Sequence, residues 1–405
     1  NALAAEGVVL DRFYTAPIST PTRAGLMTGR YPNRFGIRTT VIPPWREDGL
    51  DENEETLADM LARNGYSNRA IIGKWHLGHT RKVHYPINRG FSHFYGHLNG
   101  AIDYFDHMRE GELDWHNDWE TCYDKGYSTE LITQEAVRCI NTYEKEGPFL
   151  LYVAYNAPHT PLQAQEKDIE LYCDDFGSLT PKEQKRVTYQ AMVSCMDRGI
   201  GTIVDALKKK GIMDNTFLIF FSDNGPAGVP GSSSGKLRGR KFDEWDGGVR
   251  VPAVFYWKRA ESNYKNLSSQ VTGFVDIVPT LKELVGDKNR PERAYDGISI
   301  LPLLIGSTSC IDRNFYLGCG AVVNKDYKLI RKGRKPGLNL PQDFLVDYQT
   351  DPYEKKNASN GNEQIVRSLY QVALKYDTIT PCLPEIPYGK GREGFKAPVE
   401  WKVTR

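Results

Sequence analysis

The first three quarters of the chain alternate between short apolar runs and longer segments in which apolar residues recur every three or four positions. The apolar runs predict buried strands, and they cover residues 69–73, 149–155, 216–222 and 251–257. The periodic segments predict helices over 54–63, 128–144, 181–209 and 275–285. The longest of these begins with Thr180 as N-cap and Pro181 at the first helical position, and Gly211 closes it. Such alternation predicts an α/β fold, with a large mixed, mostly parallel sheet flanked by helices.

The pattern changes near residue 306, where strand-like runs become shorter and turns more frequent. Antiparallel strands are predicted at 315–317, 321–323, 327–331 and 344–347, and an amphipathic helix at 363–375. We therefore predict an α/β domain over 1–305 and a smaller C-terminal α+β subdomain over 306–405. The first seven residues have the composition of a helix interior, so we expect further chain upstream, including the first strand.

Composition narrows the classes of function. The 405 residues are 40% hydrophobic and 25% charged, as expected for a globular protein with a sizeable core. The 52 Lys and Arg nearly balance the 51 Asp and Glu, which argues against a nucleic-acid or membrane-surface partner. No apolar run is long enough to span a membrane, and no signal peptide is visible. The seven cysteines form no CxxC pair, so mostly free thiols are expected, with a Cys310–Cys319 bridge left open.

A hydroxyl side chain precedes the first helix signal after residue 18. Pro21 follows Ser19, Thr22 is the predicted N-cap, and Arg23 falls in the first turn. The N-terminus of a helix has unpaired N–H groups that favour negative charge, and Arg23 adds a planar cation. We therefore expect an anionic group to bind close to Ser19. Composition alone favours an ordinary helix start with no bound anion.

Histidines follow two of the predicted strands. Lys74 and His76 lie two residues apart at the end of the strand over 69–73, so both side chains face one side. In open α/β sheets, ligands bind at this carboxyl end of the strands. His159, between Pro158 and Pro161, follows the strand over 149–155, and an imidazole suits general acid catalysis on a leaving alcohol.

Two later segments supply oxygen ligands and cations. Asp223 and Asn224 end the most hydrophobic strand, and hard oxygen donors of this kind suit calcium. Lys241 belongs to a Gly-rich basic block over 236–250. Structural pairing is expected for the three arginines of that block, which are Arg238, Arg240 and Arg250.

Together these segments resemble the sulfatase family. Residues 19–29 are similar to its signature, Cys/Ser-x-Pro-Ser/Thr-Arg-x-x-x-x-Thr-Gly, and residues 73–78 (Gly-Lys-Trp-His-Leu-Gly) to its second signature. Residues 236–250 resemble a block of the arylsulfatase B-like branch, and 345–354 resemble a late segment of the family. The matches occur in the family's order and span nearly the whole chain. The resemblance implies an alkaline-phosphatase-like fold and hydrolysis of sulfate esters.

The resemblance also implies a role for each candidate residue. A sulfatase-maturating enzyme would convert Ser19 to formylglycine, whose hydrate attacks sulfur beside Arg23. Lys74, His159 and Lys241 would bind the sulfate, with His159 as general acid, while His76 would hydrogen-bond the formylglycine. Asp223, Asn224 and residue 19 would ligate Ca²⁺, which acts as a Lewis acid.

Two features of the sequence leave alternatives open. Ser19 fits the serine-type enzymes of bacteria, and it equally fits a cysteine-type enzyme in which Cys is replaced by Ser. The family's first strand normally ends in Asp-Asp-x-Gly, which supplies two more calcium ligands, and no such segment precedes Asn1. Either the numbering begins after an omitted piece, or this form is truncated and metal-free.

The arylsulfatase B-like block suggests O-sulfated galactose or N-acetylgalactosamine in a glycan such as a glycosaminoglycan, and Asp103 and His107 are predicted to line the sugar subsite. The resemblance implies a periplasmic or secreted enzyme. One alternative is a phosphonate or phosphodiester hydrolase of the same superfamily. The other is a non-catalytic protein that binds sulfated glycans, if Ser19 is unmodified.

Overall fold

The computed structural model describes residues 2–263, 267–333 and 338–403. The chain forms two compact units, each assembled from separate segments. Unit 1 comprises Asn1–Val41, Asp214–Ala227 and Ser233–Ile386, and unit 2 comprises Ile42–Met213, Gly228–Ser232 and Pro387–Arg405. The predicted boundary near residue 305 marks a different division, the change to antiparallel strands, and it stays a prediction.

Unit 2 is built on a five-stranded sheet of order β8-β7-β4-β3-β9. Its parallel part consists of β3 (Asn68–Lys74), β4 (His93–His97) and β9 (Phe149–Ala154). Two short antiparallel strands, β7 (His116–Asn117) and β8 (Glu120–Thr121), extend it beyond β4. Helix α4 provides the crossover from β4 to β9, as a βαβ unit requires, whereas two short 3-10 helices (Lys82–His84 and Pro86–Arg89) lie between β3 and β4.

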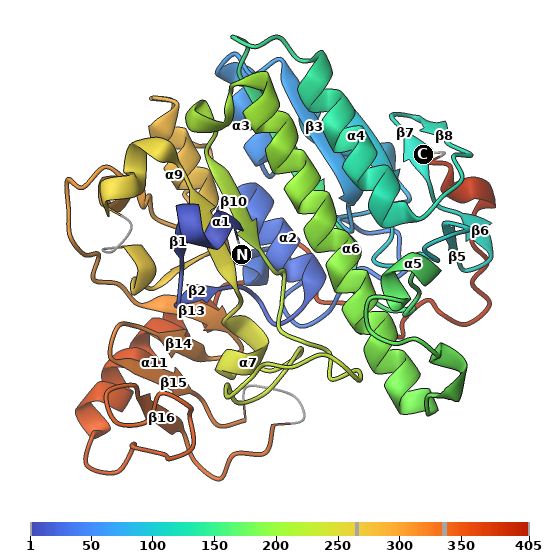
Figure 1. The fold of residues 1–405 in the computed structure, drawn as a ribbon. Helices are drawn as coiled ribbons and strands as arrows, with labels where there is room; N and C mark the ends of the chain where they lie inside the picture. Colours follow the sequence, from blue (N-terminus) through green and yellow to red (C-terminus); the bar gives the residue numbers. More distant parts are fainter. Residues whose placement is uncertain (1, 264–266, 334–337, 404–405) are drawn as a thin grey trace. The chain divides into compact units, whose positions relative to one another are not determined.

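Helices α4 (Ser128–Thr142) and α6 (Pro181–Lys210) run side by side in unit 2, and α4 packs on β3, β4 and β9 (Figure 1). Thr180 and Glu183 form a reciprocal capping box at the start of α6, and left-handed Gly211 ends it, as predicted. Shorter elements complete the unit, namely α3 (Leu57–Arg63), α5 (Glu166–Ile169), β5 (Met108–Arg109) and β6 (Glu112–Leu113).

Unit 1 has a three-stranded antiparallel sheet of order β1-β11-β10, made from β1 (Val8–Val9), β11 (Ala253–Tyr256) and β10 (Leu218–Phe221). A separate parallel pair joins β2 (Phe13–Tyr14) to β12 (Thr272–Gly273). Among the described residues, this part includes the helices α1 (Ala2–Glu6), α2 (Ser19–Thr28), α7 (Asp246–Val249), α9 (Ile277–Leu284) and α10 (Leu301–Leu304).

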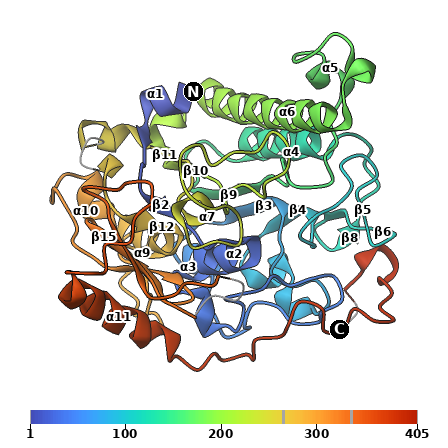
Figure 2. The same cartoon turned by 90° about the horizontal axis from the view of Figure 1, so that it is seen from below.

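The C-terminal part of unit 1 is a four-stranded antiparallel sheet in chain order: β13 (Phe315–Gly318), β14 (Ala321–Val323), β15 (Tyr327–Ile330) and β16 (Phe344–Asp347). Helix α11 (Glu363–Asp377) packs against β13, β14 and β15 (Figure 2). Buried Leu329, Leu345 and Leu369 belong to the shared core. This arrangement confirms the predicted antiparallel sheet with its final helix.

Two details differ from the sequence expectations. The strands predicted over 216–222 and 251–257 pair antiparallel, because the chain between them folds as loops and short α7 without a crossover helix. The β9 and β10 side chains were predicted to be buried, yet most are half-buried, since each strand lies at the edge of its sheet. The expectation of mostly free thiols is confirmed, because all seven cysteines are free and Cys310 and Cys319 form no bridge.

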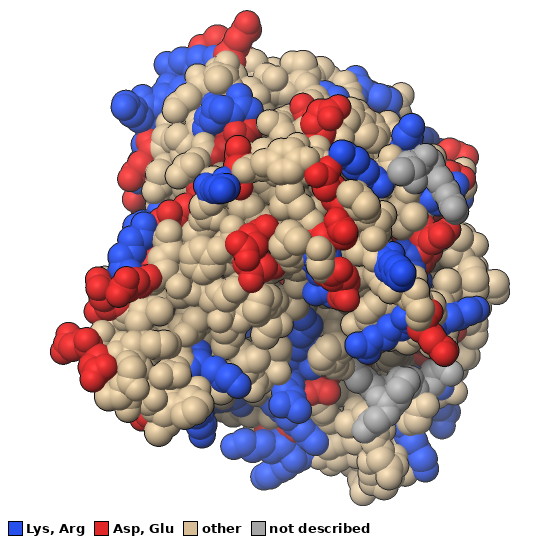
Figure 3. Space-filling view, turned by 90° about the vertical axis from the view of Figure 1, so that its right-hand side faces the viewer, with Lys and Arg blue, Asp and Glu red and all other residues tan. Residues whose placement is uncertain are grey.

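The surface is of mixed charge. Acidic and basic side chains both occur across the face drawn in Figure 3, and much of that face is uncharged, in keeping with the formal net charge of +1. Among the residues that the structure describes, no helix combines the length and apolar character needed to cross a membrane.

Candidate active site

In unit 1, Ser19 is the first residue of helix α2. The N-cap of the helix is Ile18, four residues earlier than predicted, so the prediction of Thr22 as the cap was wrong. The Thr22 hydroxyl instead donates to the carbonyl oxygens of Ala16 and Ile18, and Pro21 fits the first turn because its missing N–H needs no partner there. The buried Ser19 side chain therefore lies at the positive end of the α2 dipole.

Asn224 and Asp223 meet the first turn of α2. The Ser19 hydroxyl donates to the Asn224 side-chain oxygen over 3.2 Å, and the Asn224 amide nitrogen donates to the Gly225 carbonyl over 2.9 Å, which fixes the direction of the amide group. Arg23 pairs with Asp223, with 3.2 Å between guanidinium nitrogen and carboxylate oxygen. The sequence candidates Ser19, Arg23, Asp223 and Asn224 thus form one cluster within unit 1.

A glycine contact holds the Asp223-Asn224 turn in place. A Cβ atom on Gly225 would lie 2.0 Å from the carbonyl oxygen of Gly247, so only glycine permits this approach between the turn and helix α7. The Gly225 N–H also donates to the Gly248 carbonyl over 2.9 Å. The turn therefore packs directly against the backbone of Gly247 and Gly248, the Gly-Gly pair of the basic block.

Lys241 belongs to the same cluster. Its backbone N–H donates to the Pro226 carbonyl over 2.9 Å, which ties the basic block to the chain just after Asn224. Burial lowers the pKa of the Lys241 ammonium, the negative charge of Asp223 partly offsets this, and the positive charge of Arg23 adds to it. Two cations, Lys241 and Arg23, thus lie near the single carboxylate of Asp223. The excess positive charge favours binding of an anion at this position.

Structural pairing was expected for all three arginines of the basic block, and Arg238 and Arg250 have side-chain partners that agree with it. The Arg238 guanidinium stacks on Trp245 at 3.6 Å and donates to the Glu354 carbonyl over 2.7 Å. Arg250 pairs with Asp246 at 3.3 Å.

In unit 2, Lys74 and His76 lie at the end of β3. Lys74 is buried and stands in register with His97 of β4. His76 adopts a left-handed backbone with φ of 62°, and its Nε2 donates to the Ile42 carbonyl over 3.2 Å, which places the proton on that nitrogen. Gly100 lies against the imidazole ring, where a Cβ would come within 2.4 Å. The imidazole ring of His76 therefore has a fixed position.

His159 lies in the loop that follows β9. Its Nδ1–H donates to the Thr160 carbonyl over 2.8 Å, and its own carbonyl accepts from the Tyr104 hydroxyl over 2.9 Å. These bonds fix the imidazole so that any proton transfer to a leaving group uses Nε2.

The two predicted sugar-subsite residues have different surroundings. Asp103 accepts from the backbone N–H groups of Phe105 and Asp106 and from the Gln163 amide. Although burial raises it, these hydrogen bonds hold the pKa of Asp103 below its ordinary value. His107 is buried, stacks on Trp115 with 4.5 Å between ring centroids, and its Nε2 bonds the Gly126 carbonyl over 3.0 Å.

Asn156 is a candidate that sequence reasoning missed. It lies two residues after β9 and three before His159, its side chain is buried, and neither amide atom has a hydrogen-bond partner among the described residues. Buried side-chain amides usually have hydrogen-bond partners, so an amide that lacks them calls for an explanation such as a bound ligand. Its position, a polar residue at a strand's carboxyl end, is the signal that would have identified it.

Comparisons with known proteins identify the family of this chain. The sulfatase family model matches residues 1–287. Arylsulfatase J of Mus musculus is 36% identical over 310 residues, which is 74% of this chain and 50% of that protein. N-acetylgalactosamine-6-sulfatase of Mus musculus is 32% identical over 330 residues, 75% of this chain and 61% of that protein. The chain thus spans about half to three fifths of the length of these relatives.

A solved structure, described as Ps i-CgsB in complex with k-i-k-neocarrahexaose, is similar over 95% of this chain and 88% of that one, with a TM-score of 0.82 and 29% identity. The family match covers more than half of the chain and includes the segments that supply Ser19, Lys74, His159, Asn224 and Lys241. On these grounds the chain belongs to the sulfatase family.

Proposed function

We propose that this protein hydrolyses sulfate esters of a glycan. The observation that carries the proposal is the cluster in unit 1, where the Ser19 oxygen lies at a helix N-terminus, bonded to Asn224 and beside the cation of Arg23. Lys241 adds a second cation near the same carboxylate, Asp223. An oxygen nucleophile with cations and backbone N–H groups suits attack on an oxyanion-rich centre such as sulfur in a sulfate ester.

The residues of unit 2 are proposed to serve the same reaction. Lys74 supplies a buried cation for a sulfate oxygen, and His76 donates a hydrogen bond from an imidazole held by Ile42. His159 protonates the departing alcohol oxygen from Nε2, because Nδ1–H is engaged with the Thr160 carbonyl. Asn156, buried beside this loop, is proposed to position the ester oxygen.

Two groups are proposed to complete the site. Oxidation of Ser19 to formylglycine would supply a diol with a second hydroxyl to expel the sulfate, which a plain serine lacks. A calcium ion would supply Lewis-acid chemistry. The donor set fits calcium in part, because Asp223, Asn224 and residue 19 offer hard oxygens close together, although calcium takes six to eight. We propose that these three residues hold it.

The proposed substrate is an O-sulfated galactose or N-acetylgalactosamine unit. The similarity to an N-acetylgalactosamine-6-sulfatase and to a structure holding a neocarrahexaose supports a saccharide. Asp103 is proposed to accept hydrogen bonds from sugar hydroxyls, since its lowered pKa keeps it ionised, and His107 is proposed to shape the subsite from beneath. A sulfatase-maturating enzyme is the proposed partner, and the periplasm or the exterior the proposed location.

The test is a comparison of matured and unmatured protein. Protein co-expressed with a maturating enzyme is digested with trypsin, and the peptide over residues 13–23 is weighed. Formylglycine makes this peptide lighter by two hydrogen atoms. The same sample is assayed on defined galactose and N-acetylgalactosamine sulfates, with Ser19→Ala as the control. Conversion with release of sulfate, absent in Ser19→Ala, is expected.

Two outcomes would replace the proposal. Faster cleavage of an aryl phosphodiester than of an aryl sulfate would assign the protein to phosphodiester hydrolysis. An unmodified peptide in protein from the native host, with saturable binding of a sulfated oligosaccharide and no sulfate release, would assign it to glycan binding.

A further inference from the structure

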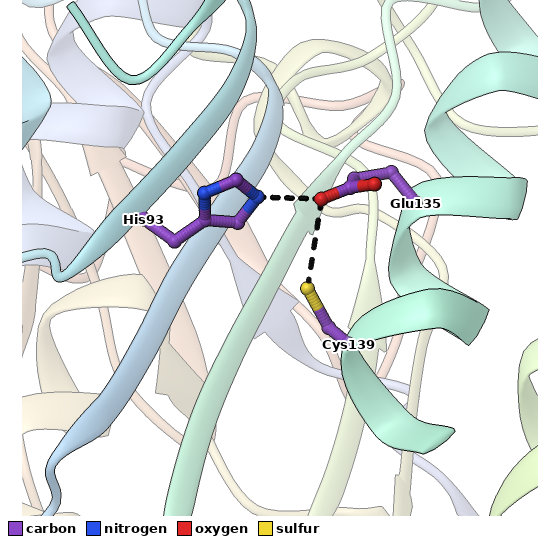
Figure 4. Close-up of side chains that lie close together, drawn as sticks. All are labelled: His93, Glu135 and Cys139. Carbon is purple, nitrogen blue, oxygen red and sulfur yellow. Dashed lines mark hydrogen bonds and ion pairs between the residues drawn. The ribbon is translucent and has the colours of Figure 1, made fainter. Parts of the chain in front are cut away.

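Three side chains with different metal-binding atoms meet in unit 2, outside the residues assigned to sulfate. Glu135 and Cys139 lie four residues apart on one face of α4, and His93 is the first residue of the adjoining strand β4 (Figure 4). His93 Nε2 lies 2.5 Å from Glu135 Oε1, and Cys139 Sγ lies 3.8 Å from the same oxygen. All three donor atoms lie within 4.8 Å of one another.

A fourth residue orients the imidazole. The Asp118 carboxylate accepts from His93 Nδ1 over 2.9 Å, and the same oxygen accepts from the Phe94 backbone N–H over 2.9 Å. A carboxylate that holds one ring nitrogen directs the other toward a bound metal, and this arrangement is usual behind histidine ligands. In His93 the nitrogen directed toward Glu135 and Cys139 is Nε2.

Arg138 shows where a cation is accommodated. Its guanidinium pairs with both Glu135 oxygens, at 2.7 and 2.5 Å, and the nearer nitrogen lies 3.5 Å from His93 Nε2 and 3.9 Å from Cys139 Sγ. A positively charged group thus already contacts all three donors. The Arg138 side chain is 54% exposed, so it can move into solvent at little cost, whereas Glu135 is 12% and His93 15% exposed.

The donors suit zinc better than calcium. Imidazole nitrogen, carboxylate oxygen and thiolate sulfur are the ligands of zinc sites, whereas calcium takes oxygen alone. Tetrahedral zinc bonds separate neighbouring donors by about 3.4–3.6 Å. The sulfur–oxygen separation of 3.8 Å is already close to this value, and the nitrogen–oxygen separation of 2.5 Å would widen by about 1 Å.

We propose that His93, Glu135 and Cys139 bind one zinc ion, with the fourth position open to water on the side of Arg138. Binding would release the protons held at His93 Nε2 and Cys139 Sγ and would move the Arg138 guanidinium into solvent. Because the three ligands join β4 to α4, the ion would clamp this helix to the sheet. The proposal does not depend on the proposed sulfatase activity.

Cobalt titration of the full chain tests the site. Co²⁺ replaces Zn²⁺ in such sites and gives a thiolate-to-metal charge-transfer band when sulfur is a ligand. The metal-free protein is titrated with Co²⁺ in excess Ca²⁺, which occupies oxygen-only sites. One equivalent of Co²⁺ is expected to produce the band, and Zn²⁺ is expected to abolish it.

Variants assign the ligands. Cys139→Ala removes the band, whereas Cys195→Ala, which changes another buried cysteine in α6, retains it. His93→Gln weakens Co²⁺ binding at least about tenfold through loss of a ligand. Arg138→Gln removes the competing cation and strengthens binding, an effect that a purely structural ion pair would not produce.

Two results would overturn the proposal. One is a failure of both the wild type and Arg138→Gln to bind one equivalent of Co²⁺ saturably, while circular dichroism shows both folded. The other is a charge-transfer band that persists in Cys139→Ala.

Discussion

The Ser19 hydroxyl bonds the Asn224 side-chain oxygen at 3.2 Å, although the two residues are 205 positions apart in the chain. This bond joins the first turn of α2 to the turn that follows β10, so it holds the proposed nucleophile against a proposed metal ligand. The amide oxygen of Asn224 has two lone pairs, so it can accept this hydrogen bond and also ligate a cation, and a substitution of Asn224 should affect both contacts.

Asn224→Ala is expected to weaken calcium binding at least about tenfold, or about 1.4 kcal/mol, because one of few oxygen ligands is lost. Ligands that bind only the folded state raise its melting temperature, so thermal unfolding with increasing Ca²⁺ measures the effect. Asn224→Asp retains an oxygen at the position and should respond to Ca²⁺ at least as strongly as the wild type. An unchanged calcium response in Asn224→Ala would remove this residue from the ligand set.

The ionisation of Lys241 is expected to limit activity at alkaline pH. Burial lowers the pKa of its ammonium, so the cation proposed to bind sulfate is lost as pH rises through a value below 10.5. The profile of kcat/KM against pH for the free enzyme should therefore fall on the alkaline side. Lys241→Arg keeps the charge at all accessible pH values and should move this fall to higher pH. If both enzymes lose activity at the same pH, another group sets the limit.

Replacing Gly225 with a larger residue is expected to lower the free energy of unfolding through a steric clash. A Cβ atom there would lie 2.0 Å from the Gly247 carbonyl oxygen, so Gly225→Ala forces the turn away from α7 and should cost about 1–3 kcal/mol of unfolding free energy. Gly201→Ala is the matched control, because Gly201 lies in α6 with nothing within 4 Å of an added Cβ. That change should stabilise by about 0.5–1 kcal/mol. Urea unfolding of both variants distinguishes the steric effect from the general effect of replacing glycine.

Local signals in the sequence predicted the local structure well. Thr180, Pro181 and Gly211 are adjacent to the helix that they delimit, and α6 begins and ends as they predict. The prediction of Thr22 as N-cap was wrong because its hydroxyl donates to the carbonyl of Ile18, four residues earlier in the chain. The preference of threonine for cap positions does not distinguish this bond from a capping bond. The direction of β10 and β11 likewise depends on how a long loop folds.

The family resemblance indicated the distant residues Ser19, Arg23, Asp223 and Asn224, which lie together, but two other clusters of distant residues were not predicted from the sequence. The ions of Asp246, Lys328 and Glu354 are buried together, with Lys328 Nζ 2.8 Å from Asp246 and 2.7 Å from Glu354. No spacing or motif relates these three positions. The pair of Glu135 and Cys139 shows helical spacing, but His93 lies 42 residues before Glu135 and joins them only through the packing of β4 on α4.

Lys328 should be essential for stability. Its ammonium is fully buried between two carboxylates, and removal of one partner from a buried ion cluster leaves an uncompensated charge. Lys328→Met is therefore expected to lose about 3–5 kcal/mol of unfolding free energy. Lys209→Met, on the exposed surface of α6, should change it by no more than about 0.5 kcal/mol. Similar losses in the two variants would contradict the role of burial.

Glu354 gives this cluster an unusual dependence on pH. Burial, with the negative charge of Asp246, raises the pKa of Glu354 to about 7 from 4.5, although Lys328 acts in the opposite direction. Between these two values the folded protein retains a proton that the unfolded chain releases, so the contribution of Glu354 to stability falls as pH rises from 4.5 to about 7. Glu354→Gln has no such proton, and its unfolding free energy should fall less than that of the wild type across this interval. Denaturant unfolding of both proteins at several pH values measures the difference. Parallel pH profiles would show that Glu354 ionises in the folded protein as it does in the unfolded chain.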